Sequence, residues 1–149
     1  MSPKVLDVGC GCEAIGDVNV DLFPSSSPHR KYSLNVSAVS NFVLADACHL
    51  PFKSKSFEIV NCSHVIEHVS DPISLIKELI RVAKRKVVIK CPHRFSSQAK
   101  LPSHIHFFHN QWFHRVLAQF PHKTTTQFAY NKIPFLPLPH EITVEVYLT

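Results

Sequence analysis

Residues 5–16 read VLDVGCGCEAIG, and this stretch carries the strongest structural signal in the chain. All three glycines of the 149-residue chain lie in it, at positions 9, 11 and 16. The short apolar run at residues 5–8, interrupted by one acid, predicts a buried strand that leads into a turn. Glycine at positions 9 and 11 permits positive φ angles and lets a ligand approach the backbone. A strand, Gly-x-Gly and a nearby acid are typical of a nucleotide site, although a tight turn without a ligand has the same pattern.

A second strand is predicted at residues 17–21, where DVNVD alternates polar and apolar side chains. It ends at Asp21, where a carboxylate can accept hydrogen bonds from both hydroxyls of a ribose. Asp21 follows Gly9 by only 12 residues, whereas dinucleotide-binding folds place this acid about 20 residues on. A helix of several turns does not fit in this interval. We therefore expect the first crossover to be a bare loop or a single turn, or the sheet to be connected unusually.

The rest of the chain alternates strand and helix patterns. Further strands are predicted at residues 41–45, 57–62, 87–89, 124–130 and 142–148. Helices are predicted at 72–86, capped by Asp71 and closed by the cations at 84–86, and at 110–120, capped by Asn110. Loops are predicted in the Ser/Pro-rich part of 22–41, at 94–101 over the site, and at the proline-rich residues 133–139. These elements predict an α/β fold in one domain, residues 1–149, as a Rossmann-like three-layer sandwich whose mostly parallel sheet has an antiparallel last strand.

Four segments together resemble class I S-adenosylmethionine-dependent methyltransferases, and most closely the type 11 branch. They are DVGCG at 7–11, Asp21, ADACHLPF at 45–52 and SFEIVNCSHVIEH at 56–68, and the resemblance covers residues 4 to 120. It implies that S-adenosylmethionine is the cofactor. The implied cofactor residues are Asp7, Gly9, Cys10 and Gly11 around the methionine end, Asp21 and Leu22 at the ribose, Asp46 and the Ala47 backbone at the adenine, and Ser63 and His64 beside the sulfonium.

Histidines are the candidates for a catalytic base. Methyl transfer from a sulfonium is an in-line displacement, so the protein mainly positions the acceptor and, where needed, removes its proton. Neutral imidazole can accept a proton near pH 7. His64 follows the fourth predicted strand and His93 the fifth, at the carboxyl ends where ligands bind. His104 and His106 are further candidates, because residues 104–108 resemble the family's segment over the acceptor pocket.

Metal-binding patterns are present but incomplete. Residues 64–68, HVIEH, match the H-x-x-E-H string of inverted zincins, which requires a helix and a further ligand downstream. Residues 10–12, CGC, have one residue between two thiols and no second pair. The histidines between 104 and 114 form another cluster. The methyltransferase-like order of the segments favours a site without a metal.

The charge distribution is strongly asymmetric. The net charge is +5, and residues 79–140 contain ten Lys or Arg and no acid. This skew suggests a nucleic acid or another anionic acceptor, although a solvated basic face has the same composition. Residues 90–93 read KCPH in place of the Asn/Asp-Pro-Pro-Tyr/Phe motif, which argues against adenine N6 or a glutamine amide as the acceptor. The alternative function is a non-catalytic methyltransferase-like module that binds nucleic acid or a protein through residues 79–140.

Composition also bears on the compartment. No apolar run reaches the roughly 18 residues that span a membrane, and MSPK leads directly into the first strand without a signal-peptide pattern. The five cysteines lack a secreted pattern and are expected to be reduced. We therefore expect a cytoplasmic protein without a membrane partner. The N-terminal helices that usually roof the pocket are lacking, so we expect a large acceptor, or closure by a homodimer or a partner subunit.

Overall fold

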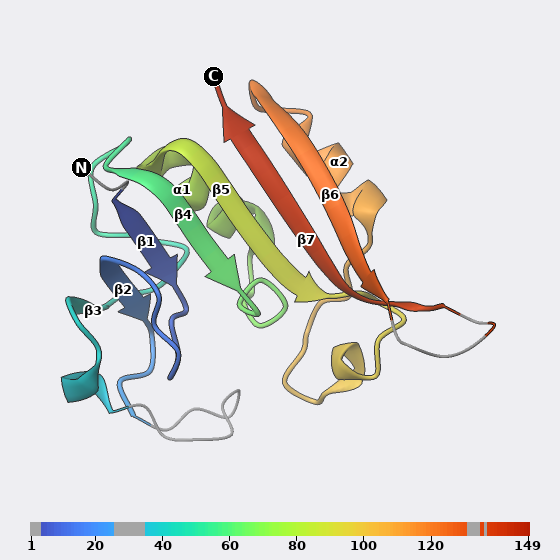
Figure 1. Cartoon of the computed structure of the whole chain (residues 1–149), viewed down its shortest axis with the longest axis horizontal. Coiled ribbons are helices and arrows are strands. Elements are labelled where there is room, and N and C mark those ends of the chain that lie inside the picture. Colours follow the sequence, from blue (N-terminus) through green and yellow to red (C-terminus); the bar gives the residue numbers. More distant parts are fainter. Residues whose placement is uncertain (1–3, 26–34, 131–134, 136) are drawn as a thin grey trace.

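The computed structural model describes residues 4–25, 35–130, 135 and 137–149, and these form one seven-stranded sheet (Figure 1). The strands are β1 (Val5–Val8), β2 (Val18–Asp21), β3 (Phe42–Leu44), β4 (Phe57–Ser63), β5 (Ala83–Pro92), β6 (His122–Tyr130) and β7 (Pro139–Leu148). Their order is β3-β2-β1-β4-β5-β7-β6. The pairs from β3 to β5 are parallel, while β7 is antiparallel to both β5 and β6. The predicted Rossmann-like sheet with an antiparallel last strand is confirmed.

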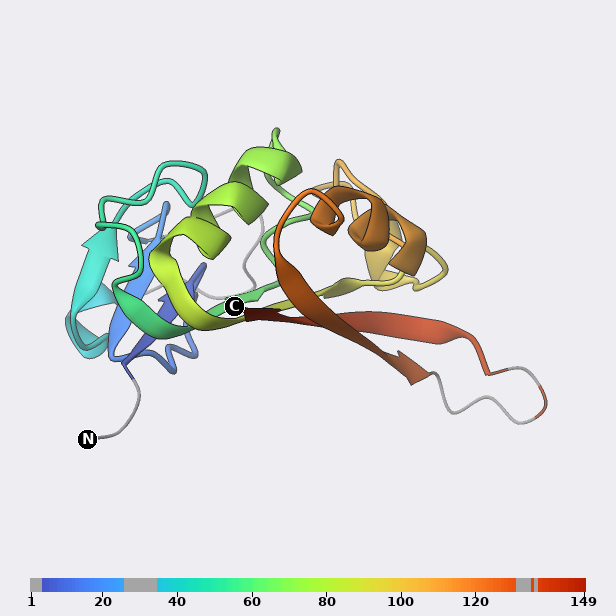
Figure 2. The same ribbon diagram turned by 90° about the horizontal axis from the view of Figure 1, so that it is seen from above.

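The helices of the described residues are α1 (Pro72–Val82), α2 (Asn110–Leu117) and the 3₁₀ turns η1 (Val36–Ala38) and η2 (Gln98–Lys100). Figure 2 shows α1 and α2 on the same face of the sheet, so they supply one of the two outer layers of a sandwich. On the opposite face, strand alternation places polar side chains of β5 and β7. There Lys86 contacts Glu145 at 2.7 Å, and the Tyr147 hydroxyl donates to Glu145 at 2.6 Å. None of the described helices has the length and apolar character needed to cross a bilayer.

A bare loop at residues 9–17 joins β1 to β2, which confirms the first alternative for the short crossover. Nine residues reach up to about 30 Å, enough to return along a four-residue strand. The Asp17 amide donates to the Val5 carbonyl at 2.9 Å, and the Ile15 amide donates to the Asp7 carboxylate at 3.1 Å. A Cβ at Gly16 would lie 2.5 Å from the Val18 oxygen. The loop therefore lies flat against the strands, and a side chain at Gly16 does not fit.

The predicted helix at 72–86 is correct at its start and wrong at its end. The Asp71 carboxylate accepts from the Ile73 and Ser74 amides, each at 3.0 Å, so it caps α1 as expected. The helix ends at Val82, and Ala83 is already extended and paired with Phe57. The cations at 84–86 belong to β5, because ladder pairing with β4 outweighs their preference for a helix C-terminus. The second helix is shorter than predicted, and Asn110 is its first residue rather than its cap. His109 stands at the N-cap position without a side-chain capping hydrogen bond.

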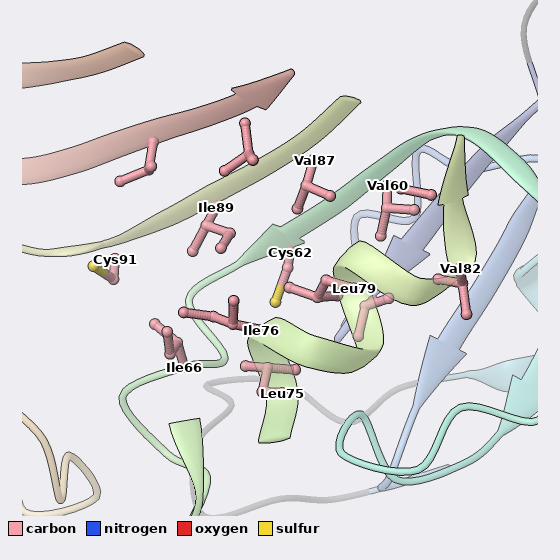
Figure 3. Packing of buried hydrophobic residues seen from close by; sticks show 14 of the residues in the cluster. Val60, Cys62, Ile66, Leu75, Ile76, Leu79, Val82, Val87, Ile89 and Cys91 are labelled. Atoms are coloured by element: carbon pink, nitrogen blue, oxygen red, sulfur yellow. The ribbon is translucent and has the colours of Figure 1, made fainter. Parts of the chain in front are cut away.

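The core lies between the sheet and the two α-helices, and Figure 3 shows the part of it beneath α1. Val60 and Cys62 of β4 and Val87 and Ile89 of β5 are at most 1% exposed. They pack in one cluster with the fully buried face of α1, formed by Leu75, Ile76, Leu79 and Val82. The stripe of α2 joins this cluster through Phe113, Val116 and Leu117, as predicted. This packing fixes the carboxyl ends of β1, β4 and β5 side by side.

Two sequence predictions fall partly outside the described residues. Within the Ser/Pro-rich stretch, residues 26–34 lie outside them, and η1 follows at Val36. Within the proline-rich stretch, residues 133, 134 and 136 also lie outside. Its last residue, Pro139, is not irregular as predicted but opens β7 opposite Tyr130.

Candidate active site

A cavity of about 570 Å³ lies at the carboxyl ends of the parallel strands β1, β2 and β4, within the range of about 300–1,000 Å³ for small-molecule sites. Seven of the predicted cofactor residues line it: Gly9, Gly11, Asp21, Leu22, Asp46, Ala47 and His64. These residues come from four separate segments of the sequence. The sheet brings them together because the carboxyl ends of parallel strands share one edge.

The glycine loop forms one wall of the cavity. Gly9 and Gly11 have φ angles of 72° and 52°, which residues with a Cβ adopt only with strain. The Gly9 and Cys10 amides both donate to the Val20 carbonyl, at 2.8 and 3.0 Å. A Cβ at Gly9 would lie 2.1 Å from the Cγ2 atom of Val65. The loop therefore packs directly against the segment that follows β4, and that contact requires glycine.

Asp21 ties the glycine loop to the end of β2. Its Oδ2 atom accepts from the Gly11 amide at 3.0 Å, and its Oδ1 atom accepts from the Phe23 amide at 2.9 Å. The residue is 8% exposed and lines the cavity. The carboxylate is thus held in a fixed position by backbone donors.

Asp46 follows β3 in a turn stabilised by its own side chain. Its carboxylate accepts from the Cys48 amide at 2.8 Å and lies 3.2 Å from Nδ1 of His49. The Cys48 amide, more than the nearby His49 ring, holds the pKa of Asp46 below its usual value. The neighbouring Cys48 thiol has its pKa raised to about 11 by burial and by the carboxylates of Asp46 and Asp71.

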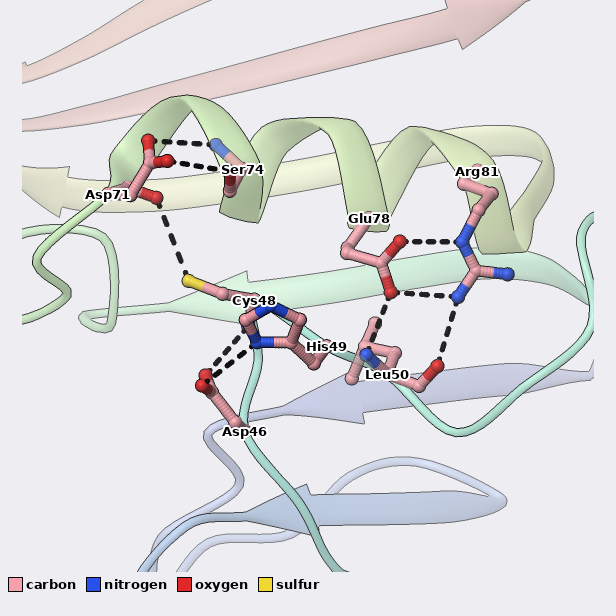
Figure 4. Close-up of polar contacts among 8 residues, drawn as sticks. All are labelled: Asp46, Cys48, His49, Leu50, Asp71, Ser74, Glu78 and Arg81. Carbon is pink, nitrogen blue, oxygen red and sulfur yellow. Dashed lines mark hydrogen bonds and ion pairs between the residues drawn. The ribbon is translucent and has the colours of Figure 1, made fainter.

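An ion pair on α1 supports this turn (Figure 4). The Glu78 carboxylate accepts from the Leu50 amide at 2.7 Å and from the Arg81 Nε at 2.6 Å. Arg81 in turn donates to the carbonyls of Phe52 and Leu50, at 2.6 and 3.0 Å. The hydrogen bonds to Arg81, helped by the Leu50 amide, lower the pKa of Glu78 despite partial burial. The adenine-side wall of the cavity is thereby anchored to the helix layer.

His64 stands at the end of β4 in an unusual backbone conformation. Its φ angle of 55° is left-handed, and its amide donates to the Lys90 carbonyl at 2.9 Å. Its ring lies between two carboxylates, with Nδ1 3.4 Å from Glu67 and Nε2 3.1 Å from Glu141. Contact with Glu67 raises the pKa of His64, burial opposes this rise, and Glu141 adds to it. Such strain in a residue other than glycine is typical of functional sites.

Four predicted residues lie outside the lining of the cavity: Asp7, Cys10, Ser63 and His93. Asp7 is buried beneath the 9–17 loop, and burial raises its pKa. His93 is 7% exposed and packs against Phe95 and Phe128, with ring centroids 5.2 and 5.9 Å apart. Burial is the main cause that lowers the pKa of His93. Of the four histidines predicted as candidate bases, His64 lines the cavity, whereas His93, His104 and His106 do not.

Sequence reasoning did not identify several residues that line the cavity. Cys48 and His49 lie within the 45–52 segment, next to the predicted Asp46. Val65 and His68 belong to residues 64–68, which form the turn after β4. Because a turn has no regular periodicity, the sequence did not predict which of these side chains face the cavity. Ile105 also lines the cavity, in agreement with the expected position of residues 104–108 over the pocket.

The sequence of this chain matches a known protein family. The family model described as a methyltransferase domain matches residues 6–89, more than half of the chain. The chain belongs to the methyltransferase domain family. The matched range contains β2 to β4, α1 and most of β1 and β5, and it includes the glycine loop, Asp21, Asp46 and His64.

Curated relatives match this methyltransferase domain at moderate identity. The tRNA U34 carboxymethyltransferase of Nautilia profundicola is 31% identical over 86 residues, which cover 50% of this chain and 29% of that protein. The ubiquinone biosynthesis O-methyltransferase of Methylococcus capsulatus is 32% identical over 97 residues, covering 54% of this chain and 39% of that protein. The chain thus spans about a third of the length of these relatives.

Solved structures share the fold. A SAM-dependent methyltransferase from Archaeoglobus fulgidus superposes with a TM-score of 0.71 at 19% identity, covering 97% of this chain and 86% of that chain. A SAM-dependent methyltransferase from Thermotoga maritima gives a TM-score of 0.72 at 14% identity, covering 100% and 84%. Family membership implies S-adenosylmethionine as the cofactor. The cavity volume, the glycine wall and the fixed carboxylates of Asp21 and Asp46 fit a nucleoside with an amino-acid tail.

Proposed function

We propose that the methyltransferase domain transfers a methyl group from S-adenosylmethionine to an anionic acceptor. The observation that supports this most directly is the cavity, which joins the glycine loop, Asp21, Asp46 and His64 at one sheet edge. Prearranged hydrogen-bond acceptors in a cavity at the carboxyl ends of parallel strands are suited to a nucleoside ligand. The intact cavity does not favour the alternative of a module that has lost its cofactor.

The proposed roles follow the position of each side chain. We assign Gly9 and Gly11 to the methionine end, with Cys10 and Asp7 supporting that loop from below. We assign Asp21 and Leu22 to the ribose, Asp46 and the Ala47 backbone to the adenine, and His64, with Ser63 next to it in the chain, to the sulfonium side. The bound cofactor supplies an activated methyl group together with its own leaving group. The protein's part is then to fix the acceptor in line and to exclude water.

His64 is the residue we assign to the acceptor proton. It lines the cavity, and its ring is held from both sides by Glu67 and Glu141. The carboxylates of Glu67 and Glu141 beside the ring restrict its orientation and would stabilise the imidazolium that forms when the ring takes up the acceptor proton. Since His93 faces β6 rather than the cavity, we do not extend this role to it.

Exposed cations near this edge of the sheet support an anionic acceptor. Ion pairs neutralise some of the other cations of residues 79–140, so the excess positive charge of this stretch is smaller in the folded protein than in the sequence. Arg81, Lys84 and Lys86 form ion pairs with acids that lie outside the acid-free stretch. Lys90 is exposed near the carboxyl end of β5, and its carbonyl accepts from the His64 amide, while Arg94 is exposed two residues beyond that strand. Such cations would attract a phosphate or carboxylate toward this edge of the sheet. The five reduced cysteines agree with the proposed cytoplasmic location.

The test begins with calorimetric titration of the purified chain with S-adenosylmethionine and, separately, with a nicotinamide dinucleotide. We expect saturable binding of S-adenosylmethionine alone, and saturable binding of only the dinucleotide would overturn the proposal. Labelled methyl transfer onto fractionated cell extract then identifies the acceptor class. In parallel, gel mobility shifts with RNA at several salt concentrations measure nucleic-acid binding. A steep salt dependence without any methyl incorporation would support the non-catalytic alternative.

A further inference from the structure

Glu67, in the turn after β4, is a buried acid without a hydrogen-bond partner. The residue is 1% exposed, and neither carboxylate oxygen makes a hydrogen bond. The Nδ1 atom of His64 lies 3.4 Å from the Oε1 atom of Glu67. Burying a carboxylate without hydrogen bonds is strongly unfavourable unless a compensating charge lies beside it. A metal cation beside Glu67 would supply such a charge.

Two histidines lie beside Glu67. One donor atom from each of Glu67, His68 and His104 falls within 4.8 Å of the others. Ligands that each lie about 2.1 Å from one tetrahedral ion are about 3.4 Å apart. Closing the cluster around an ion thus requires the donor atoms to approach one another by up to about 1.4 Å, which side-chain rotation can supply. We propose that Glu67, His68 and His104 bind a divalent transition-metal ion beside the cofactor cavity.

Backbone hydrogen bonds orient His68 and hold the two segments of the cluster together. Nδ1 of His68 lies 2.9 Å from the Ser103 carbonyl, and because a carbonyl only accepts, Nδ1 carries the proton. That tautomer leaves Nε2 as the basic nitrogen, which is the usual arrangement of a metal-binding histidine with an outer hydrogen bond. The Ile105 amide donates to the Glu67 carbonyl at 2.9 Å, so the two segments are joined directly at the cluster.

The donor set determines the kind of ion. Two imidazole nitrogens and one carboxylate suit Zn²⁺, Co²⁺ or Mn²⁺ better than Ca²⁺, which prefers oxygen ligands. Three protein ligands leave a coordination position for water or for an acceptor. His68 and Ile105 line the cavity, so the cluster adjoins it. Binding of an acceptor oxygen at that position rests on the proposed function, whereas metal binding itself does not.

The sequence alone could not complete this site. The string at 64–68 lacked the downstream ligand that the metal pattern requires, and His104 is separated from it by more than thirty residues. The fold supplies this ligand by placing the 103–105 segment over the turn after β4.

The experiment uses the untagged full chain, stripped with chelator and titrated with Zn²⁺ by calorimetry and with Co²⁺ by visible absorption. We expect one equivalent of metal to bind and the Co²⁺ spectrum to show nitrogen coordination. Glu67→Gln and His104→Gln are expected to weaken Zn²⁺ binding by more than ~100-fold, because loss of a direct ligand exceeds the 10–100-fold effect of an outer-shell partner. His114→Ala is the control, since His114 is exposed on α2. It should bind Zn²⁺ like the unmodified chain.

Two results would overturn the site: absence of stoichiometric binding by the unmodified chain, or equal metal affinity in the Gln variants. S-adenosylmethionine titration in chelator reports separately on the fold and on the proposed function. If metal binds and S-adenosylmethionine does not, the proposed function fails and the metal site stands. If a Gln variant keeps cofactor binding and loses metal, the loss is not due to unfolding. Unfolding in chelator gives a further readout, because Glu67→Gln removes a buried charge and should not lower stability there.

Discussion

Substitution of Gly9 by alanine tests the contact between the glycine loop and the turn after β4. The φ angle of 72° costs an L-residue about 1–2 kcal/mol. The added methyl group would lie 2.1 Å from Cγ2 of Val65, an overlap that the structure must relieve by movement. Overpacking of this kind costs about 1–3 kcal/mol. We therefore expect Gly9→Ala to lower the free energy of unfolding by about 2–5 kcal/mol.

Truncation of Val65 separates the two contributions. Val65→Ala removes Cγ2 and leaves Cβ at 3.4 Å from the new methyl group, which is an ordinary contact. In that background Gly9→Ala should cost only the backbone term of about 1–2 kcal/mol. The coupling energy of the double-mutant cycle is then about 1–3 kcal/mol, and the cost of Val65→Ala itself cancels.

Urea denaturation of the four proteins measures this cycle, with the midpoint reporting stability and an unchanged m-value reporting an intact unfolding transition. Gly16→Ala is a useful comparison, because its Cβ would meet backbone atoms that no side-chain truncation can remove. A coupling energy near zero between positions 9 and 65 would refute the steric account of the glycine loop.

Three further predictions concern the walls of the cavity. Asp21→Ala should weaken binding of S-adenosylmethionine by about 1–3 kcal/mol through loss of ribose hydrogen bonds, and unchanged affinity in calorimetry would mean that this acid does not contact the ribose. Glu78 has a lowered pKa, so its contribution to stability is present above its unfolded pKa near 4.5 and is lost as pH falls through the folded value. Glu78→Gln should therefore destabilise the protein at pH 7 in urea melts and much less at pH 3, and an equal loss at both would contradict the ion-pair account. Cys48, with a pKa of about 11, should react with iodoacetamide at pH 8 far more slowly than the exposed Cys12, as followed by mass spectrometry; equal rates would show that burial does not protect the thiol.

Local sequence patterns were sufficient for the approximate positions of the strands along the chain, the capped start of α1 and the position of the glycine loop. Each depends on neighbours within a few residues: alternation in β2, Asp71 before Pro72, and glycine where φ is positive. The 12-residue interval from Gly9 to Asp21 was likewise enough to predict a first crossover without a long helix. These features are local in the chain, so the sequence alone determined them.

Only the tertiary structure decided where the helix of the 72–86 stretch ends, which candidate base lines the cavity, and which histidines lie beside Glu67. Ala83 is extended because it pairs with Phe57, a partner far away in the sequence. His93 turns toward Phe128 of β6, while the 103–105 segment brings His104 to Glu67. Such contacts join residues dozens of positions apart, and their free energy comes from sheet pairing and shared burial. Periodicity within one segment carries no information about either.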